Sequence, residues 1–124
     1  MYLGRNTYYY LAHPLTSFGD IEKNRENEQI CYETIREKYP DVVILRPLTL
    51  IPENFTDDEA MEVCEELLSI SDSIIFCSEW KHSAGCVAEY ELARANGLEV
   101  IDIKEITLND EVIDLTENKM EVRE

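Results

Sequence analysis

The sequence predicts an α/β protein: a single Rossmann-like or flavodoxin-like domain with a parallel sheet of four or five strands and helices on both faces. Short apolar segments alternate with helical segments along the chain, which is the pattern of a wound parallel sheet. The length of 124 residues suits one domain with one core, spanning residues 1–124. We expect a strand order of about 2-1-3-4-5, with ligands bound where the order reverses, between the first and third strands.

The expected strands are short and rich in apolar or aromatic side chains. The second and third are apolar almost throughout, as is typical of strands covered on both faces. The first carries three consecutive tyrosines, which favour strand structure. The predicted strands are residues 7–12, 42–45, 73–77 and 98–103, with a short fifth at 111–115.

Three helices are expected between these strands. The first runs from about Ile21 to Tyr39 and is ended by Pro40. Residues 56–59, Thr-Asp-Asp-Glu, form a capping box that opens the second helix, and apolar side chains then recur at helical spacing. Ser83 is a good N-cap for the third helix, and Gly97 is a natural stop. Residues 13–20, 46–55 and 78–83 are expected to be loops.

The charge balance restricts the partners. Acidic residues outnumber basic ones by 27 to 11, for a net charge of −16. This argues against nucleic acid and against an anionic membrane surface as partners. Part of the charge lies in an acidic C-terminal segment, at about residues 105–124, which is expected to be solvated.

The four cysteines lie at positions 31, 64, 77 and 86 and form no C-x-x-C pair. We interpret them as reduced thiols of a cytoplasmic protein. Cys77, His82 and Cys86 match no common zinc spacing, so no metal is expected. No signal peptide and no run of transmembrane length are visible.

The loops at 13–20 and 78–83 both leave strands at the predicted switch point, so a pocket is expected between them. A helix that starts at Ser83 offers N–H groups to an anion or a sugar hydroxyl. Further along this helix, Glu89 shares a row with Gly85 and Ala93, which are small enough to let a ligand approach the carboxylate. We also expect the helix dipole to keep Glu89 ionised.

These segments resemble the nucleoside 2-deoxyribosyltransferase-like superfamily, which includes small uncharacterised relatives and nucleoside 5′-monophosphate N-glycosidases. A first strand ending Y-I-A-G-P-M-T-G in those relatives corresponds to residues 10–17, Y-L-A-H-P-L-T-S. The pattern W-x-x-S-x-G-x-x-x-E-x-x-x-A-x-x-x-G corresponds to residues 80–97, following Asp72 at the start of the preceding strand. The resemblance covers about residues 8–103.

The resemblance implies cleavage of the N-glycosidic bond of a nucleoside or nucleotide, by hydrolysis or by transfer to a second base. Glu89 stands at the position of the nucleophile that attacks the anomeric carbon. Tyr10, or failing that Tyr9, stands at the position of the tyrosine that orients it. Ser83 matches a serine that binds a 5′-phosphate, where nucleoside transferases carry an acidic residue. No cofactor is implied, and the relatives suggest a homodimer or higher homo-oligomer.

The sequence departs from the superfamily pattern at two positions. The acid that protonates the leaving base falls on or near Cys64, which cannot supply this proton, so Asp58 is the substitute we assign, with Glu65 also nearby. His13 stands where relatives usually carry Gly or Ser, and it would narrow the pocket or contact the ligand. The complete set of expected substrate-binding residues is His13, Pro14, Asp20, Trp80, Ser83 and Gly85.

Simpler interpretations stand beside these assignments. Glu89 is also compatible with an ordinary solvated helix position, Trp80 with packing over the sheet end, and Asp20 with capping of the first helix. At the level of function, the alternatives are a module of the same fold that binds and senses a nucleotide without cutting it, and a protein-interaction domain with a vestigial pocket.

Overall fold

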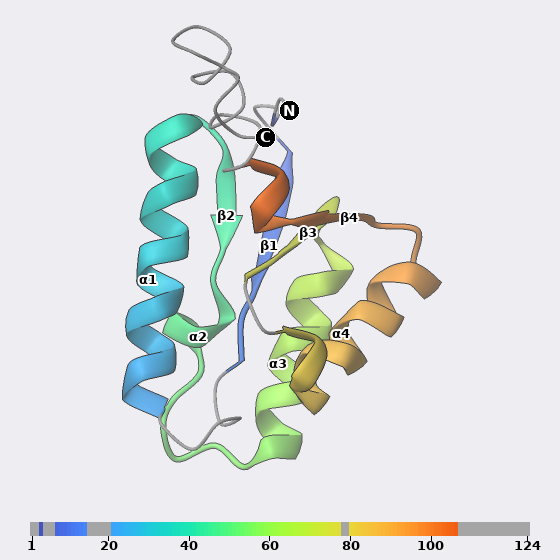
Figure 1. The fold of residues 1–124 in the computed structure, drawn as a ribbon. Helices are drawn as coiled ribbons and strands as arrows, with labels where there is room; N and C mark the ends of the chain where they lie inside the picture. Colours follow the sequence, from blue (N-terminus) through green and yellow to red (C-terminus); the bar gives the residue numbers. More distant parts are fainter. Residues whose placement is uncertain (1–2, 4–6, 15–20, 78–79, 107–124) are drawn as a thin grey trace, which may run out of the picture.

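The computed structural model describes residues 3, 7–14, 21–77 and 80–106. In this part of the chain four parallel strands form one sheet in the order β2-β1-β3-β4 (Figure 1). The strands are β1 (Tyr8–Ala12), β2 (Val43–Leu45), β3 (Ser73–Phe76) and β4 (Glu99–Asp102). The α/β class and the order of the first four strands are therefore confirmed. The fifth strand predicted at 111–115 lies outside the described residues.

The three predicted helices are present, together with short helical segments that were not predicted. The long helices are α1 (Ile21–Lys38), α3 (Asp57–Ser69) and α4 (Ala84–Ala95). Two of the short ones, α2 (Pro47–Leu50) and the 3-10 turn η2 (Trp80–His82), lie inside segments expected to be loops. Residues 103–106 form a further helical turn after β4. Pro47 occupies the first turn of α2, where its fixed φ and missing N–H cost nothing, so proline begins a helix here instead of marking a loop.

The helix starts follow the predicted capping chemistry. The Thr56 side chain accepts a hydrogen bond from the Glu59 backbone N–H, and the Glu59 carboxylate accepts one from the Thr56 N–H, which completes the capping box of α3. Ser83 caps α4 by accepting from the Cys86 N–H at 3.3 Å. Gly97 follows α4 with a φ of 77°, in the left-handed region that glycine adopts without strain.

Two clusters of buried hydrophobic side chains pack against opposite faces of the sheet, and Figure 1 shows α1 on one side of the sheet and α3 and α4 on the other. Tyr9 and Leu11 of β1 contribute to the layer packed by α1, whereas Tyr10 and Ala12 contribute to the layer packed by α3 and α4. This separation follows from the alternation of side chains along a strand.

The expectation that the second strand is covered on both faces is wrong for β2. Val43 is 38% exposed, and Ile44 and Leu45 are only partly buried. The physical reason is position, because β2 is the edge strand of the described sheet and pairs with β1 alone.

Candidate active site

A cavity of about 400 Å³ lies beyond the carboxyl ends of β1 and β3, at the switch point that the sequence predicts. We call it the glutamate cavity, because Glu89 contributes to its wall. Its volume is within the range of about 300–1,000 Å³ that is usual for small-molecule sites. It is lined by the residues after β1, by α2 and its C-cap, by the first two turns of α3 and by the start of α4: His13, Pro14, Leu48, Ile51, Asp57, Asp58, Ala60, Met61, Cys64, Ser83, Ala84, Gly85, Cys86, Ala88 and Glu89.

Glu89 lines this cavity and is in contact with Tyr10, which lies behind it in the core. The phenol O–H of Tyr10 donates a hydrogen bond to Oε2 of Glu89. Tyr10 is fully buried in the centre of the sheet and Glu89 is 6% exposed, so both groups are held by packing. The contact joins residues 79 positions apart and places the tyrosine against the carboxylate in the arrangement that the resemblance implies.

Two thiols complete the surroundings of the carboxylate. Cys64 of α3 and Cys86 of α4 are both hydrogen-bonded to Glu89, and both are buried. Cys86 lies one helical turn before Glu89, at the i, i+3 spacing that brings side chains together. From the sequence, Cys64 was considered only at the position of the leaving-base acid, and neither thiol was expected to contact Glu89, although this spacing was a signal for Cys86.

Burial dominates the ionisation of Glu89 and raises its pKa to about 7. Hydrogen bonds from Tyr10, Cys64 and Cys86 act in the opposite direction, because they stabilise the charged form. The expectation that the helix dipole keeps Glu89 ionised is therefore wrong. Glu89 is the sixth residue of α4, and the dipole effect falls off within the first turn.

The three donors keep their protons at neutral pH. Burial raises the pKa of Tyr10 well above its ordinary value, and the neighbouring Glu89 adds to this effect. Burial likewise raises the pKa of Cys64 and that of Cys86 to about 12. All three groups therefore present an O–H or S–H to Glu89 and do not compete with it as anions.

Ser83 lies at the cavity wall where α4 begins. Its side chain is 3% exposed, and its Oγ accepts the capping hydrogen bond from Cys86, which leaves the hydroxyl proton to be donated elsewhere. The first N–H groups of a helix lack acceptors within the helix, so Ala84 and Gly85 present donors at the same wall. This end of the cavity suits an anion or a hydroxyl group.

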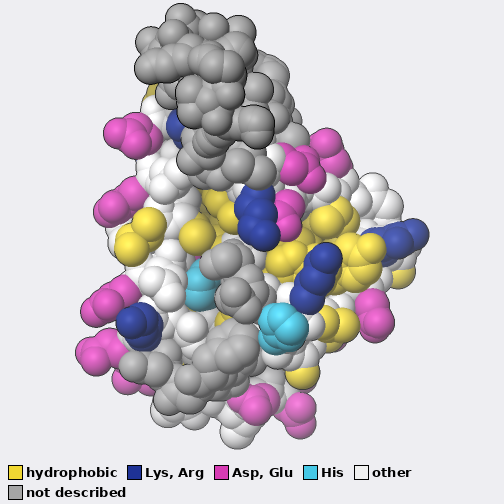
Figure 2. Space-filling view, viewed as in Figure 1, with side chains coloured by type: hydrophobic (Ala, Val, Ile, Leu, Met, Phe, Trp, Pro, Cys, Tyr) yellow, Lys and Arg dark blue, Asp and Glu magenta, His cyan; other side chains and the backbone are white. Residues whose placement is uncertain are grey.

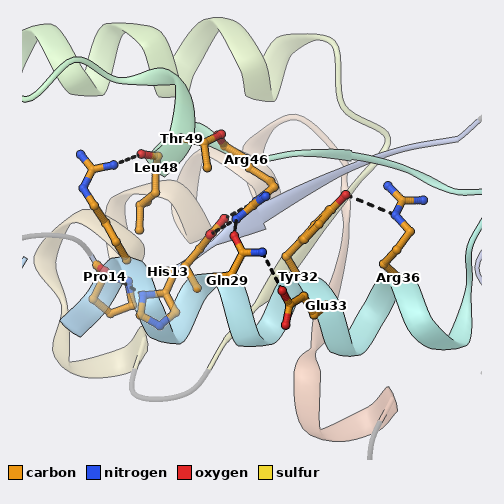
Figure 3. Close-up of polar contacts among 11 residues, drawn as sticks. His13, Pro14, Gln29, Tyr32, Glu33, Arg36, Arg46, Leu48 and Thr49 are labelled. Atoms are coloured by element: carbon orange, nitrogen blue, oxygen red, sulfur yellow. Dashed lines mark hydrogen bonds and ion pairs between the residues drawn. The ribbon is translucent and has the colours of Figure 1, made fainter. Parts of the chain in front are cut away.

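His13 lines the cavity directly after β1. Its Nδ1 lies 2.7 Å from the carbonyl oxygen of Pro14 and donates to it, since a carbonyl can only accept (Figure 3). Burial lowers the pKa of His13, so the neutral ring is favoured. In that tautomer Nε2 carries the lone pair and can accept a hydrogen bond.

The other expected site residues fall into three groups. Asp58 lines the glutamate cavity from the first turn of α3, together with Asp57, which the sequence analysis did not select. Trp80 does not line it: its ring stacks on Phe76 with centroids 4.3 Å apart and also contacts Tyr90, as the packing interpretation predicted. Asp20 lies outside the described residues.

Within the described residues, no group of three or more His, Cys, Asp or Glu side chains is arranged to hold a metal ion. The four cysteines are free thiols. Over the same residues, no helix combines the length and the apolar character needed to cross a membrane.

The fold and the cavity define a class: a parallel α/β domain with a buried carboxyl group in a pocket at the switch point. Residues 7–102 match the sequence profile of a family described as a domain of unknown function (DUF4406), and the chain belongs to this family. Among solved structures it is similar to the 2-desoxiribosyltransferase from Leishmania mexicana, with 20% identity and a TM-score of 0.56. That similarity covers 77% of this chain but 63% of the enzyme chain, and it establishes the fold. A comparison with curated proteins gave no match.

Proposed function

We propose that the protein cleaves the N-glycosidic bond of a nucleoside or nucleoside 5′-monophosphate, with Glu89 as the nucleophile. The observation that carries the proposal is that Glu89, which accepts a hydrogen bond from the buried Tyr10, lines a cavity at the switch point. A carboxylate buried beside a ligand-sized cavity is suited to attack at an anomeric carbon, where positive charge develops in the transition state. The fold shared with a 2-desoxiribosyltransferase supports this assignment.

The proposed reaction has two steps. The Glu89 carboxylate forms a bond to C1′ while the bond from C1′ to the base nitrogen breaks, and the electron pair leaves with the base. The base takes up a proton, and we assign Asp58 as its donor. Asp58 lies at the cavity wall with Asp57 beside it. Water then hydrolyses the glycosyl ester and regenerates the carboxylate, or a second base accepts the sugar.

The orientation of the nucleotide in the glutamate cavity follows from the chemistry of the cavity walls. Ser83 and the N–H groups of Ala84 and Gly85 receive the sugar 5′ end or its phosphate. Glu89 faces C1′, and the base extends towards Ile51, Ala60 and Met61 on the opposite wall. His13 accepts a hydrogen bond from a sugar hydroxyl through Nε2. Assembly into a homodimer or larger homo-oligomer remains a prediction that light scattering can test.

The test is release of free base, followed by chromatography, from a panel of nucleosides and their 5′-monophosphates. Wild-type protein is expected to release base from at least one compound, and Glu89→Gln is expected to release none while keeping its fold and its affinity for the ligand. Release by Glu89→Gln at the wild-type rate would overturn the assignment of the nucleophile.

One observation favours a second candidate, a module that binds a nucleotide without cutting it. Cys64 stands where the resemblance places an acid for the leaving base, and its pKa of about 12 makes it unable to supply that proton at a useful rate. Thermal stabilisation by a nucleotide with no base released over hours would support this function instead.

A further inference from the structure

A second cavity, of about 440 Å³, adjoins the glutamate cavity. We call it the arginine cavity, because Arg25 of α1 is the one Lys or Arg among the described residues that line either cavity. Ile51, Asp57 and Ala60 line both cavities, so the two spaces share one wall. Neither Ser83 nor Glu89 lines the arginine cavity.

The shared wall determines which end of a ligand can reach the second cavity. With the phosphate at Ser83 and C1′ at Glu89, the base lies towards Ile51 and Ala60. The arginine cavity begins on that side, so it continues the space around the base and not the space around the phosphate.

The remaining walls describe what would fill this space. Ile21 is 46% exposed and Phe55 is 38% exposed, and both line the cavity with Ile51 and Pro52. Large apolar side chains that remain partly exposed at a concave site favour an apolar ligand group.

Arg25 adds a polar requirement. One terminal nitrogen of its guanidinium donates to the carbonyl oxygen of Leu48, which fixes the side chain against α2. Its Nε is buried and has no hydrogen-bond partner among the residues that the structure describes. An unpaired buried donor is costly, so an acceptor supplied by a ligand, with a small shift of the side chain to reach it, would be favourable.

The charges around this cavity decide between a charged and a neutral acceptor. Glu22, Glu53 and Asp57 also line it, which gives three carboxylates against one guanidinium. A carboxylate or phosphate would be repelled by this surplus, whereas a carbonyl or hydroxyl oxygen would not.

We propose that the substrate is a nucleotide with an enlarged base, whose apolar substituent enters the arginine cavity and presents a neutral oxygen acceptor to Arg25. This inference rests on the proposed function for the orientation of the ligand. It adds the substrate class, a base-modified nucleotide, to the bond that is cleaved.

The test compares three ligands by isothermal titration calorimetry: 2′-deoxyadenosine 5′-monophosphate, its N6-benzyl derivative and its N6-benzoyl derivative. The benzyl group supplies apolar surface, and the benzoyl group supplies the same ring with a carbonyl oxygen. We expect wild-type protein to bind the benzyl derivative about tenfold more tightly than the parent, and the benzoyl derivative more tightly still. Equal or weaker binding of both derivatives would overturn the inference.

Two variants separate the two contributions. Arg25→Met is expected to remove the advantage of benzoyl over benzyl, and Phe55→Ala to reduce the advantage of both over the parent compound. Arg94→Met removes the same charge from an exposed site outside both cavities and should change none of the affinities. If Arg25→Met leaves the benzoyl advantage intact, the assigned role of Arg25 is wrong.

Base release from the unmodified nucleotides keeps this inference separate from the proposed function. Cleavage without any preference for substituted bases would overturn the inference and leave the function standing. The expected order of affinities without any cleavage would overturn the function and keep the binding specificity.

Discussion

At the scale of single residues, the carboxyl group of Glu89 is subject to opposing influences. Burial raises its pKa and three hydrogen bonds lower it, and burial dominates, so the resulting pKa is about 7. A nucleophile must be ionised, so at neutral pH the protein is close to the midpoint between its reactive and unreactive forms. Activity is therefore expected to rise with pH through an apparent pKa near 7.

Stability is expected to change in the opposite direction, because the folded-state pKa of Glu89 lies above the ordinary value of 4.5. The protonated carboxyl stabilises the fold fully below about pH 4.5, and this contribution is lost as the pH rises past 7. Glu89→Gln cannot ionise, so its stability relative to wild type should increase by about 3 kcal/mol between pH 4.5 and pH 8.

Urea unfolding of both proteins at several pH values measures this difference. Glu91→Gln, at an exposed position of the same helix, provides the matched control and should show no such increase. Parallel pH profiles for wild type and Glu89→Gln would show that Glu89 has an ordinary pKa in the folded protein.

The thiol of Cys64 gives a second prediction at this scale. Cys64→Ala removes one donor to the carboxylate, so the pKa of Glu89 should rise further, by roughly 0.5–1 unit. Cys64→Ser restores a donor and should return the pKa towards the wild-type value. Carbon-13 NMR of the glutamate side chains follows this pKa directly, independently of activity.

Cys31→Ala serves as the control for this series, because Cys31 packs against the layer on the other face of the sheet. A pKa of Glu89 that is the same in Cys64→Ala and in wild type would exclude the hydrogen bond as a determinant of the ionisation.

At the scale of elements, the start of α4 combines two functions in Ser83. Its Oγ caps the helix, and Ser83 also lines the cavity together with the residues that carry the first free N–H groups of the helix. These functions can be separated, because aspartate is an equally good N-cap but carries a negative charge.

Ser83→Asp is therefore expected to keep the stability of the fold within about 0.5 kcal/mol, as for a cap replaced by an equivalent cap. The carboxylate should weaken binding of a nucleoside 5′-monophosphate at least tenfold and leave binding of the corresponding nucleoside nearly unchanged. Calorimetric titration with both ligands measures the contrast. An equal loss for both ligands would place the phosphate elsewhere.

At the scale of the whole molecule, the first helix is fixed to the segment after β2 by a buried ion pair. Arg46 donates from Nη2 to Oε1 of Glu28 at 2.7 Å and from Nε to Oε2 at 3.0 Å. Glu28 is 1% exposed, and the Arg46 guanidinium lies 4.0 Å from the centre of the Tyr32 ring (Figure 3). This group holds α1 against α2, whose C-cap Ile51 is part of the wall shared by the two cavities.

Glu28→Ala leaves the Arg46 charge largely covered and without this partner, and we expect a loss of about 3–5 kcal/mol in the free energy of unfolding. Glu26→Ala, at an exposed position of the same helix, should change stability by less than about 0.5 kcal/mol. Chemical denaturation of both variants tests this expectation, and similar stabilities would show that the ion pair contributes little.

The surface of the molecule is strongly acidic. Acidic side chains follow the outer edge of α1, in agreement with the net charge of −16 (Figure 2). Negative charge at this density slows the approach of anionic ligands, an effect that salt screens.

Local patterns were sufficient to predict much of the fold. The capping box at Thr56, the cap at Ser83 and the stop at Gly97 are short-range hydrogen-bonding or conformational features, and each lies where the sequence placed it. The short helix α2 was missed because a proline can either end a helix or occupy its first turn, and the local sequence around Pro47 does not distinguish these two cases.

The sequence by itself determined the α/β class, the order of the described strands and the candidate glutamate, because periodicity, caps and motif spacing are properties of neighbouring residues. Only the tertiary structure decided that Cys64 and Cys86 surround Glu89, that Trp80 packs outside the glutamate cavity and that burial outweighs the helix dipole. Those outcomes depend on which side chains from separate elements exclude water from the same place, and this is fixed only when the helices pack on the sheet.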